Sequence, residues 1–578
     1  MDDKRTLLAF LLIGLIFVLS PYYYEWMGMT PKPEGPTPEE VEDTKYIERE
    51  NRVAEKIERP IETGNQQDQD RQKWESSEVE TAQQEYVRPA TKSFEYTPQN
   101  VYVETPLLNL VFSTKGGVLT SAELTEYQLY DQNPVQLISS RGKGLVLSLQ
   151  QIDRIEDLSQ AEFVPDQEVI RFQEGQKQLI MTAQLSDNRT IQKVYTFNSE
   201  RYGFDLEVRY KGFSEDVDVL ISWNGGVPFT EKNPEMDLLE MSSIASFNNE
   251  RIEIQVEDEE NEAWDSEGGL QWIGARNKYF LTAIIPLEQE RRLKARLNGD
   301  RMSPDLLPNY KFEIGRQLSS TGSWKSSVYV GPLDYDILIQ YGVGLEQAID
   351  FGYPIIRSVT KFLLIVFKEA YKYIPNYGWI IILFAVVIKV IFYPFQAKSL
   401  ESMRKMQEIQ PKISALREKY KNDSQRLSQE TMKLYKKEGV NPVGGCLPML
   451  PQMPIFFALY TLFSSTIELR QAPFALWVTD LSMPDEVMIG GFGLRVLPLL
   501  VAFSMFVQQK MTMKDPKQAA FVYILPVFMA FVFWGMSSGL NLYWMLFNVL
   551  AVGQQLIVNR SRNSGQDVSS GSSSGPIG

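Results

Sequence analysis

The chain has 578 residues, a formal net charge of −15, one cysteine and no histidine. These counts exclude a disulfide within the chain, a zinc site of the Cys/His type, and catalysis by a Ser-His-Asp or Cys-His set. The acidic balance argues against nucleic acid as the main partner. Apolar runs crowd the two ends of the chain, and a polar, acidic region lies between them.

The first apolar run, from Thr6 to Tyr24, follows Lys4 and Arg5. It is short enough for a signal peptide, but no small-x-small cleavage site follows it, and the aromatic residues at its end are typical of a membrane interface. We therefore interpret residues 1–29 as an uncleaved transmembrane anchor. Residues 30–100 are rich in Pro, Glu and Gln, and we expect them to form a disordered tether because they cannot bury enough apolar surface.

Residues 101–335 contain short β-like runs, such as FDLEVRY and DVDVLISW, separated by turn residues. Strands of this length with alternating apolar positions predict an antiparallel β-sandwich. We expect Gly116-Gly117 and Gly225-Gly226 to form turns or bulges, and the acidic stretch at 256–269 to be a solvated loop. The acidic residues are scattered through this domain, so no catalytic site is expected in it.

Residues 345–375 are expected to hold an amphipathic helix on the membrane surface. Apolar residues recur at helical spacing from Ile355 to Phe367, and cationic residues such as Arg357, Lys361 and Lys372 occupy the remainder. An apolar face with cationic edges suits an interfacial helix. A helix of a soluble core is the weaker alternative, because an apolar span begins five residues later.

That span, at 377–395, is long enough to cross the hydrocarbon core, which takes about 20 apolar residues. Lys389 is its only charge, and a lysine at a helix centre costs roughly 2.5–3.5 kcal/mol on insertion scales. Lys389 is therefore expected to face a helix-bundle interior or a hydrated cavity. The alternative is that Lys389 snorkels to the headgroups, since it lies only six residues before Phe395.

Four more spans are expected at 446–467, 488–507, 518–536 and 540–558, which makes six with the anchor. Cys446 is interpreted as a small packed residue. The Ser537-Ser538-Gly539 link leaves room only for a tight hairpin between the last two spans. Residues 561–578 are interpreted as a flexible tail.

Orientation follows from the loop at 396–438, which has 11 Lys and Arg against 6 Asp and Glu, a net charge of +5. The positive-inside rule places this loop and both termini in the cytoplasm, and the acidic region outside. The loop reads as two helices that break at Asn422-Asp423 and stop at Gly439. It is either a plain solvated hairpin or a cytoplasmic docking surface for an anionic or apolar partner. The candidate docking residues are Arg404, Lys405, Lys412, Arg417 and Lys419.

Several long stretches together resemble the YidC family of membrane-protein insertases, in its Gram-negative six-span form with a large periplasmic domain. They are KVIFYPFQAKSLESMRKMQEIQPKISALREKY, NPVGGCLPMLPQMPIFFALY, ELRQAPFALWVTDLS and SSGLNLYW. The resemblance implies a multi-pass protein of the bacterial inner membrane with a five-helix insertase core at 376–560. It also implies nascent membrane proteins, the Sec translocon and lipid as partners, with no enzymatic activity, cofactor or metal.

In this family, the last five spans enclose a hydrophilic groove that holds one positive residue, and Lys389 stands at the matching position. Many members have arginine there; lysine keeps the charge but lacks the bidentate fork. The resemblance places substrate contacts at Tyr543 and Trp544, and Gln452 falls in the matching GGC…QMP segment. The family's strongly basic C-terminal tail is missing, so ribosome contact through a tail is not expected.

Two other functions fit part of the pattern. A secondary transporter or lipid flippase could use the same charged intramembrane cavity, but the spans show no evident inverted repeat. A carbohydrate enzyme in the outer domain would need only one anchoring span. We therefore expect insertion and folding of membrane proteins without ATP hydrolysis, since no Walker A motif occurs.

Overall fold

The computed structural model describes residues 85–87 and 98–570, except for gaps at 141, 152–153, 186–187, 214–216, 257–259, 289–291, 304–306, 422, 441–448 and 513–518. The predicted anchor, most of the predicted tether, Cys446 and residues 571–578 lie outside the described residues. The described chain divides into two compact units. One contains the strands up to Pro332 together with Leu338–Ala348, and the other contains Leu333–Ile337 and the chain from Ile349 onward.

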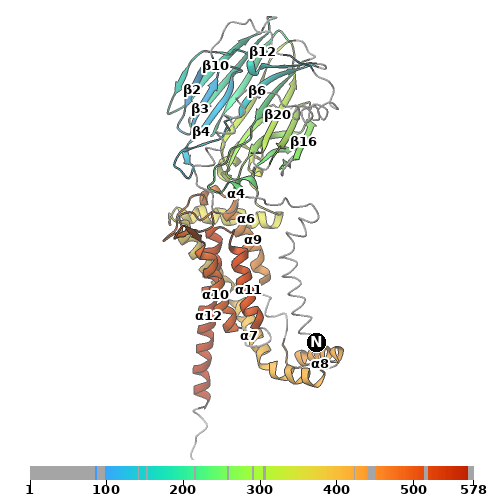
Figure 1. Ribbon diagram of the computed structural model, residues 1–578, viewed down its shortest axis with the longest axis vertical. Coiled ribbons are helices and arrows are strands. Elements are labelled where there is room, and N and C mark those ends of the chain that lie inside the picture. Colours follow the sequence, from blue (N-terminus) through green and yellow to red (C-terminus); the bar gives the residue numbers. More distant parts are fainter. Residues whose placement is uncertain are drawn as a thin grey trace, which may run out of the picture. The chain divides into compact units, whose positions relative to one another are not determined.

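The first unit is a β-sandwich of two large sheets, as predicted (Figure 1). One sheet has twelve strands, and nine of them follow the order β16-β19-β20-β13-β6-β4-β3-β2-β9. Its strands are β1 (Glu85–Val87), β2 (Asn100–Glu104), β3 (Leu108–Ser113), β4 (Val118–Gln128), β5 (Pro134–Gln136), β6 (Lys143–Gln150), β7 (Arg154–Asp157), β9 (Val169–Arg171), β13 (Asp218–Asn224), β16 (Glu260–Glu267), β19 (Lys294–Arg301) and β20 (Asn309–Gln317).

The other sheet has nine strands in the order β15-β14-β17-β18-β21-β12-β11-β10-β8. They are β8 (Val164–Pro165), β10 (Gln176–Gln184), β11 (Thr190–Asn198), β12 (Gly203–Lys211), β14 (Ser242–Phe247), β15 (Glu250–Ile254), β17 (Leu270–Arg276), β18 (Phe280–Pro286) and β21 (Thr321–Pro332). Neighbouring strands of this sheet pair antiparallel throughout. A short helix, α4 (Pro234–Leu238), connects β13 to β14.

Large apolar side chains fill the sandwich. Trp223, Trp272 and Trp324 are each less than 2% exposed. Phe112 of β3 meets Phe204 of β12 with ring centroids 5.9 Å apart, so aromatic packing joins the two sheets. Such pairs add about 0.5–1.5 kcal/mol beyond the area that they bury.

The acidic stretch at 256–269 was predicted as a loop, and that prediction is wrong for most of it. Residues 260–267 form β16, which pairs with β19 over eight residues at the edge of the larger sheet. Most of its side chains are exposed. An edge strand needs a partner on one side only, so charge on its faces does not prevent pairing.

The predicted glycine turns are confirmed. Gly116, Gly117, Gly225 and Gly226 all have positive φ, between 54° and 106°. A Cβ on Gly116 would lie 2.7 Å from the carbonyl oxygen of Ser159, so only glycine fits there. This turn orients two carbonyl groups toward the interior, where they meet Lys193. Its ammonium donates to the carbonyls of Gly116, Gly117 and Leu145 at 2.8–2.9 Å.

The second unit is helical (Figure 1). Its longer helices are α6 (Pro354–Tyr371), α7 (Tyr377–Lys419), α8 (Ser424–Lys437), α9 (Met449–Ser465), α10 (Val496–Thr512), α11 (Ala519–Phe533) and α12 (Ser538–Ser570). Figure 1 shows α6 lying across the ends of the upright helices. Helix α10 packs on α11 and α12, α7 packs on α12, and α6 packs on α9.

The predicted span at 377–395 and the first half of the basic loop form one helix of 43 residues. Pro394 and Pro411 lie inside α7 without ending it, and the residues between them are mostly good helix formers. Figure 1 shows α7 changing direction after its apolar part. The predicted break follows at Tyr420, and Asp423 then caps α8 through the backbone N–H of Arg426.

The predicted span at 488–507 begins too early. Residues Val487–Ile489 (β22) and Phe492–Leu494 (β23) pair as a hairpin, and α10 starts only at Val496. A short apolar run does not distinguish strand from helix, and the Gly490-Gly491 pair, with φ of 59° and 85°, forms the turn. The other predicted spans correspond to α9, α11 and α12, whose ends differ from the predicted limits by a few residues, except that α12 continues to Ser570. The prediction of a flexible tail is therefore wrong for residues 561–570, which extend this helix. The link between α11 and α12 is short, as expected.

Candidate functional site: the Lys389 cluster

Lys389 lies on the inner side of α7. It is 9% exposed, and its Nζ lies 4.3 Å from the centroid of the Phe547 ring on α12. Along the described chain, no carboxylate lies within ion-pair distance of it. A buried ammonium over an aromatic face is attracted by the ring electrons, by roughly 2 kcal/mol or more when desolvated. Its position on the apolar half of α7 thus puts a charge in contact with the neighbouring helix.

Tyr543 continues this contact along α12. It is fully buried, with its ring centroid 5.9 Å from that of Phe547 and 6.2 Å from that of Phe384 on α7. Residues 543 and 547 are four apart, so they share one face of the helix. The structure therefore brings together two of the predicted site residues, Lys389 and Tyr543, in one row between α7 and α12.

Trp544 and Gln452 lie apart from that row. The Trp544 ring packs between Phe456 of α9, at 4.9 Å, and Phe533 of α11, at 5.4 Å. Gln452 is half-buried on α9, one turn before Phe456. The predicted substrate contacts are thus distributed over two sides of α12.

Polar residues on α10 and α12 were not identified from the sequence. Asn548 is buried and donates to the Ser504 hydroxyl at 3.3 Å, and Gln509 is 8% exposed. The sequence feature that could have revealed them is the recurrence of a polar residue at successive turns of an otherwise apolar helix. These residues line the interior of the same helix pair that holds Phe547.

Several buried polar atoms of this region lack a hydrogen-bond partner among the described residues. On α10 and α12 they are Gln509 Oε1, Asn541 Oδ1, Tyr543 Oη, Trp544 Nε1 and Gln554 Nε2. More than nine in ten buried polar groups in native proteins are paired with protein or water. Five unpaired atoms on α10 and α12 therefore indicate a region that suits water or the polar groups of a bound chain.

Helix α6 is fixed to the other helices by packing and by charge. Phe367 contacts Phe384 of α7 and Phe463 of α9, at 5.5 and 6.0 Å between ring centroids. Lys368 lies 2.9 Å from Glu468 and 2.6 Å from Asp336. Burial alone would lower the pKa of Lys368, but the carboxylates of Glu468, Asp336 and Asp334 outweigh it and raise that pKa. The ammonium therefore stays charged and ties α6 to the segment after α9.

The candidate docking residues on α7 are largely paired within the chain. Arg404 contacts Glu408 at 3.1 Å, Lys405 contacts Glu401 at 2.9 Å, and Lys412 contacts Glu438 at 2.7 Å. The Nζ of Lys419 lies 5.5 Å from the Tyr420 ring centroid. Arg417 is half-buried on the same helix. An apolar cluster of Ile409, Ile413 and Val440, with Met406, Leu434 and Tyr435 packed on it, holds α7 against α8.

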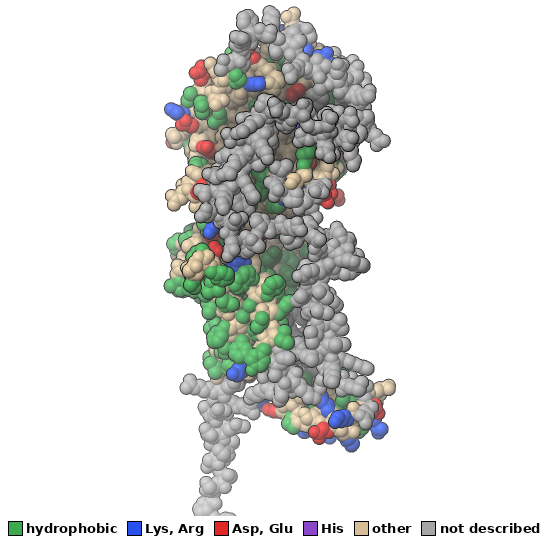
Figure 2. Space-filling view, viewed as in Figure 1, with side chains coloured by type: hydrophobic (Ala, Val, Ile, Leu, Met, Phe, Trp, Pro, Cys, Tyr) green, Lys and Arg blue, Asp and Glu red, His purple; other side chains and the backbone are tan. Residues whose placement is uncertain are grey.

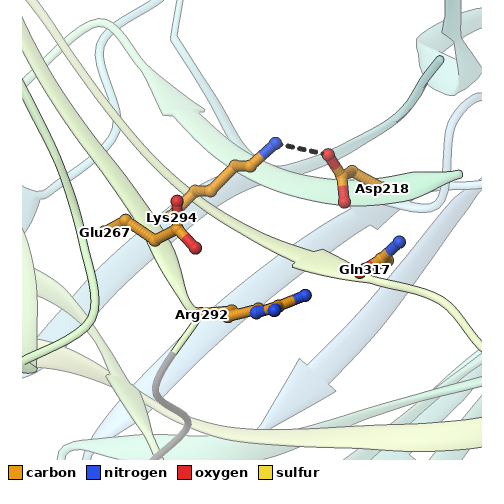
Figure 3. Close-up of a pocket in the computed structure, with 5 residues that line it drawn as sticks. All are labelled: Asp218, Glu267, Arg292, Lys294 and Gln317. Carbon is orange, nitrogen blue, oxygen red and sulfur yellow. Dashed lines mark hydrogen bonds and ion pairs between the residues drawn. The ribbon is translucent and has the colours of Figure 1, made fainter. Parts of the chain in front are cut away.

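The β-sandwich unit has a surface cavity of 190 Å³ (Figure 3). Asp218, Glu267, Arg292, Lys294 and Gln317 line it. Lys294 and Asp218 point toward each other and form an ion pair at 2.6 Å, whereas Arg292 lies across the cavity. The ammonium of Lys294 and a carboxylate oxygen of Asp218 are thus already paired with each other.

The helical unit exposes large apolar side chains over α7, α10 and α11, and green side chains dominate this part of Figure 2. On α11, Ile524, Val527 and Phe531 are 62–78% exposed. Within the described residues, α7 and Ser538–Ile557 of α12 are long and apolar enough to cross a membrane, and α10 and α11 contain shorter apolar stretches. Apolar surface of this extent marks contact with lipid or protein.

Two family models match the chain. The 60Kd inner membrane protein model matches residues 369–565, and the YidC periplasmic domain model matches residues 100–366. The membrane protein insertase YidC of Pelobacter propionicus is 36% identical over 494 residues, which cover 80% of this chain and 87% of the relative. The same protein of Syntrophus aciditrophicus is 36% identical over 477 residues, 80% of this chain and 85% of the relative.

A solved structure of an active YidC insertase is also similar, with 18% identity and a TM-score of 0.35 over 80% of this chain and 94% of that one. A likeness of this size supports no inference by itself.

The fold, the apolar helices and the family matches define an inner membrane protein with a periplasmic β-sandwich domain. The chain belongs to the YidC family of membrane protein insertases, and it is therefore an insertase rather than an enzyme.

Proposed function

We propose that the Lys389 cluster is the part of this insertase that receives the polar tail of a nascent membrane protein. The cluster consists of Lys389, Tyr543 and Phe547 with the polar residues of α10 and α12. One observation carries the proposal: Lys389 is buried on an apolar helix, faces an aromatic ring, and has no carboxylate partner among the described residues. A buried cation of this kind is a site for an anionic group.

Buried polar atoms on α10 and α12 support a hydrated groove. Gln509, Tyr543, Trp544 and Gln554 each keep one polar atom that no described residue pairs. Water in the groove would satisfy these atoms, and it would shorten the apolar distance that a polar tail must cross. The groove is open to lipid on one side, where the hydrophobic segment of the client leaves it.

The energy of insertion comes from the client. Lys389 attracts the acidic residues of its tail, and the hydrophobic segment then moves along the open side of the groove into the bilayer. Burial of apolar surface releases about 25 cal/mol per Å², so a segment of about 20 residues needs no nucleotide hydrolysis. Trp544 and Gln452 contact the moving segment, and Tyr543 shapes the wall behind Lys389.

The membrane arrangement that fits this mechanism has six spans, with the anchor at 1–29 and a core of five helices. The net positive charge of the segment at 396–438 supports a cytoplasmic location for the α7–α8 hairpin and both termini under the positive-inside rule. The hairpin is then a docking surface for the machinery that delivers clients. Arg404, Lys405 and Lys412 already form ion pairs within the hairpin. We therefore expect the apolar and aromatic side chains of the hairpin, rather than these charges, to contact the partner. The Sec translocon and lipid are further partners.

Insertion by the full chain in liposomes tests the proposal. The client is a single-span protein with an acidic tail, supplied also with a neutral tail. Lys389→Arg is expected to keep insertion, and Lys389→Glu to abolish it for the acidic tail only. Lys398→Glu is the matched control, since Lys398 is exposed nine residues later on the same helix. Wild-type insertion of the acidic-tailed client by Lys389→Glu contradicts the proposal, and lipid transfer that depends on Lys389 favours a flippase.

A further inference from the structure

The β22–β23 hairpin carries large apolar side chains that are mostly exposed. Met488, Ile489 and Phe492 are 65%, 59% and 64% exposed. A Cβ placed on Gly490 or Gly491 would meet no atom within 4 Å, so the space beside the turn is open in the described chain. No charged residue occurs between Glu486 and Arg495. An isolated two-stranded hairpin is marginally stable in water, so this apolar tip needs an apolar environment.

The base of the hairpin is held firmly. Asp485 is 3% exposed and accepts hydrogen bonds from the backbone N–H groups of Val496 and Leu497, at 2.8 and 2.9 Å, and from Trp477 Nε1 at 3.0 Å. Arg495 donates to the carbonyl of Trp534 at the end of α11. Asp485, two residues before the first strand, and Arg495, directly after the second, are thus both fixed to the helices. The hairpin is therefore a projection set at the start of α10 rather than a frayed loop.

One face of the hairpin is apolar, and the other carries the Glu486 carboxylate at the base and Met488 further out. Ile489 pairs with Phe492 and Val487 pairs with Leu494, which puts these four side chains on one face. Met488 lies opposite Gly493 on the other face. A hairpin that covers a protein core buries one face and exposes polar residues on the other. In this hairpin the apolar side chains Ile489 and Phe492 are exposed, and the one carboxylate, that of Glu486, stays at the base over Gly493.

We propose that the β22–β23 hairpin inserts its tip into the bilayer surface next to α10, with its apolar side chains among lipid acyl chains. The apolar surface continues from the hairpin onto α10, where Leu499 is 43% exposed and Phe503 is 65% exposed. This surface faces lipid in a protein of the inner membrane. The inference rests on the membrane location of the family and not on the groove proposed above.

The depth of insertion follows from the backbone. Strands of three residues rise about 10 Å at 3.4 Å per residue. Their outer edges leave N–H and C=O groups unpaired, which excludes the hydrocarbon core. An interfacial segment lies about 5–10 Å deep, where water still reaches the backbone and acyl chains reach the side chains. With the positive-inside orientation, the contacted leaflet is the outer one.

Spin-label accessibility in liposomes tests this proposal with the full chain. Cys446→Ser removes the single cysteine, and labels are then placed with Ile489→Cys and Phe492→Cys, both exposed positions. Phe503→Cys on α10 is the lipid-facing control. Leu239→Cys, 73% exposed in the β-sandwich unit, is the aqueous control. The tip labels are expected to collide often with oxygen and several-fold less often with a water-soluble nickel chelate than the label at 239 does.

Two results overturn the proposal. Nickel collisions at the level of Leu239→Cys would put the tip in water. Protection from both reagents would mean that protein covers the tip, either a second copy or a partner. Met488→Cys on the opposite face repeats the measurement if one label disturbs the Ile489–Phe492 pair. Because these collision rates do not depend on insertion activity, failure of the groove proposal leaves this test intact.

Discussion

The ammonium of Lys389 lies 4.3 Å from the centroid of the Phe547 ring, and this contact joins the one charge of the apolar part of α7 to α12. The interaction is favourable for both residues. The ring offers a cation an apolar contact that also carries a favourable electrostatic field. The cation in turn makes an aromatic residue preferable to an aliphatic one at position 547.

Phe547→Leu is expected to weaken insertion of a client with an acidic tail and to leave a neutral-tailed client unaffected. Leucine keeps the helix packing but loses the cation–π contact, worth about 0.5–2 kcal/mol, or about twofold to thirtyfold in a rate that depends on it. Phe503→Leu on the exposed face of α10 is the matched control. Faster insertion by Phe547→Leu would instead show that the ring competes with the client for the ammonium.

Substitutions at Trp544 distinguish the packing role of its ring from the hydrogen-bonding role of its indole N–H. Trp544→Phe should still fill the space between Phe456 and Phe533, whereas Trp544→Ala should leave a cavity and cost about 3–5 kcal/mol of stability. If the unpaired indole N–H contacts the client, Trp544→Phe will reduce crosslinking of a photoreactive client segment to α12 at unchanged thermal stability. Equal crosslinking yields for Trp544→Phe and the unsubstituted chain would leave Trp544 with a packing role alone.

The sequence predicted the β-sandwich, the helix that became α6 and the break between α7 and α8, because periodicity and turn residues are local signals. It did not predict that Lys389 would meet Phe547, since 158 positions separate them and only the helix packing brings them together. The polar residues Gln509 and Gln554 were missed for the same reason. Neither glutamine indicates a site by itself, and only the structure shows that each buries a polar atom without a partner among the described residues.

Two errors have a common cause. The β22–β23 segment was predicted as part of a membrane span, and β16 as a loop. Both predictions rested on the composition of the segment alone, and composition does not show which strand a segment pairs with. Apolar composition does not determine whether the backbone pairs with itself across a Gly-Gly turn. Acidic composition does not prevent a strand from completing a sheet edge.

Lys368 is expected to stabilise the helical unit more than its neighbour Lys372. Lys368→Met leaves the carboxylate of Glu468, which is 12% exposed, without the ammonium that it pairs with, and breaking such a pair costs about 3 kcal/mol. Lys372→Met is the matched control, because Lys372 and its partner Glu369 are both largely exposed. Thermal unfolding in detergent should show a lower midpoint for Lys368→Met and no change for Lys372→Met. Equal midpoints for the two variants would mean that packing alone, through Phe367, holds α6.

Lys193 should stabilise the β-sandwich, although it is a fully buried cation. Lys193→Met removes the donor from the carbonyls of Gly116 and Leu145, and each buried acceptor left unpaired costs about 1–3 kcal/mol. Gly117 keeps its hydrogen bond from the Tyr195 hydroxyl. The control is Lys177→Met, at an exposed position of β10. Unfolding by denaturant, followed by tryptophan fluorescence, is expected to show a lower midpoint for Lys193→Met only.

The same lysine should make stability depend on pH. Burial lowers the pKa of Lys193 to about 7, from 10.5 in the unfolded chain. Between these two values the unfolded chain holds a proton that the folded chain lacks, so this group makes the unfolding free energy rise with pH, by at most about 1.4 kcal/mol per pH unit. Below pH 7 both states are protonated and the contribution is constant. Lys193→Met should remove this slope between pH 7.5 and pH 9.5, a window taken from the two pKa values, while Lys177→Met should keep it. Identical slopes in all three proteins would mean that the three carbonyl acceptors keep Lys193 charged throughout.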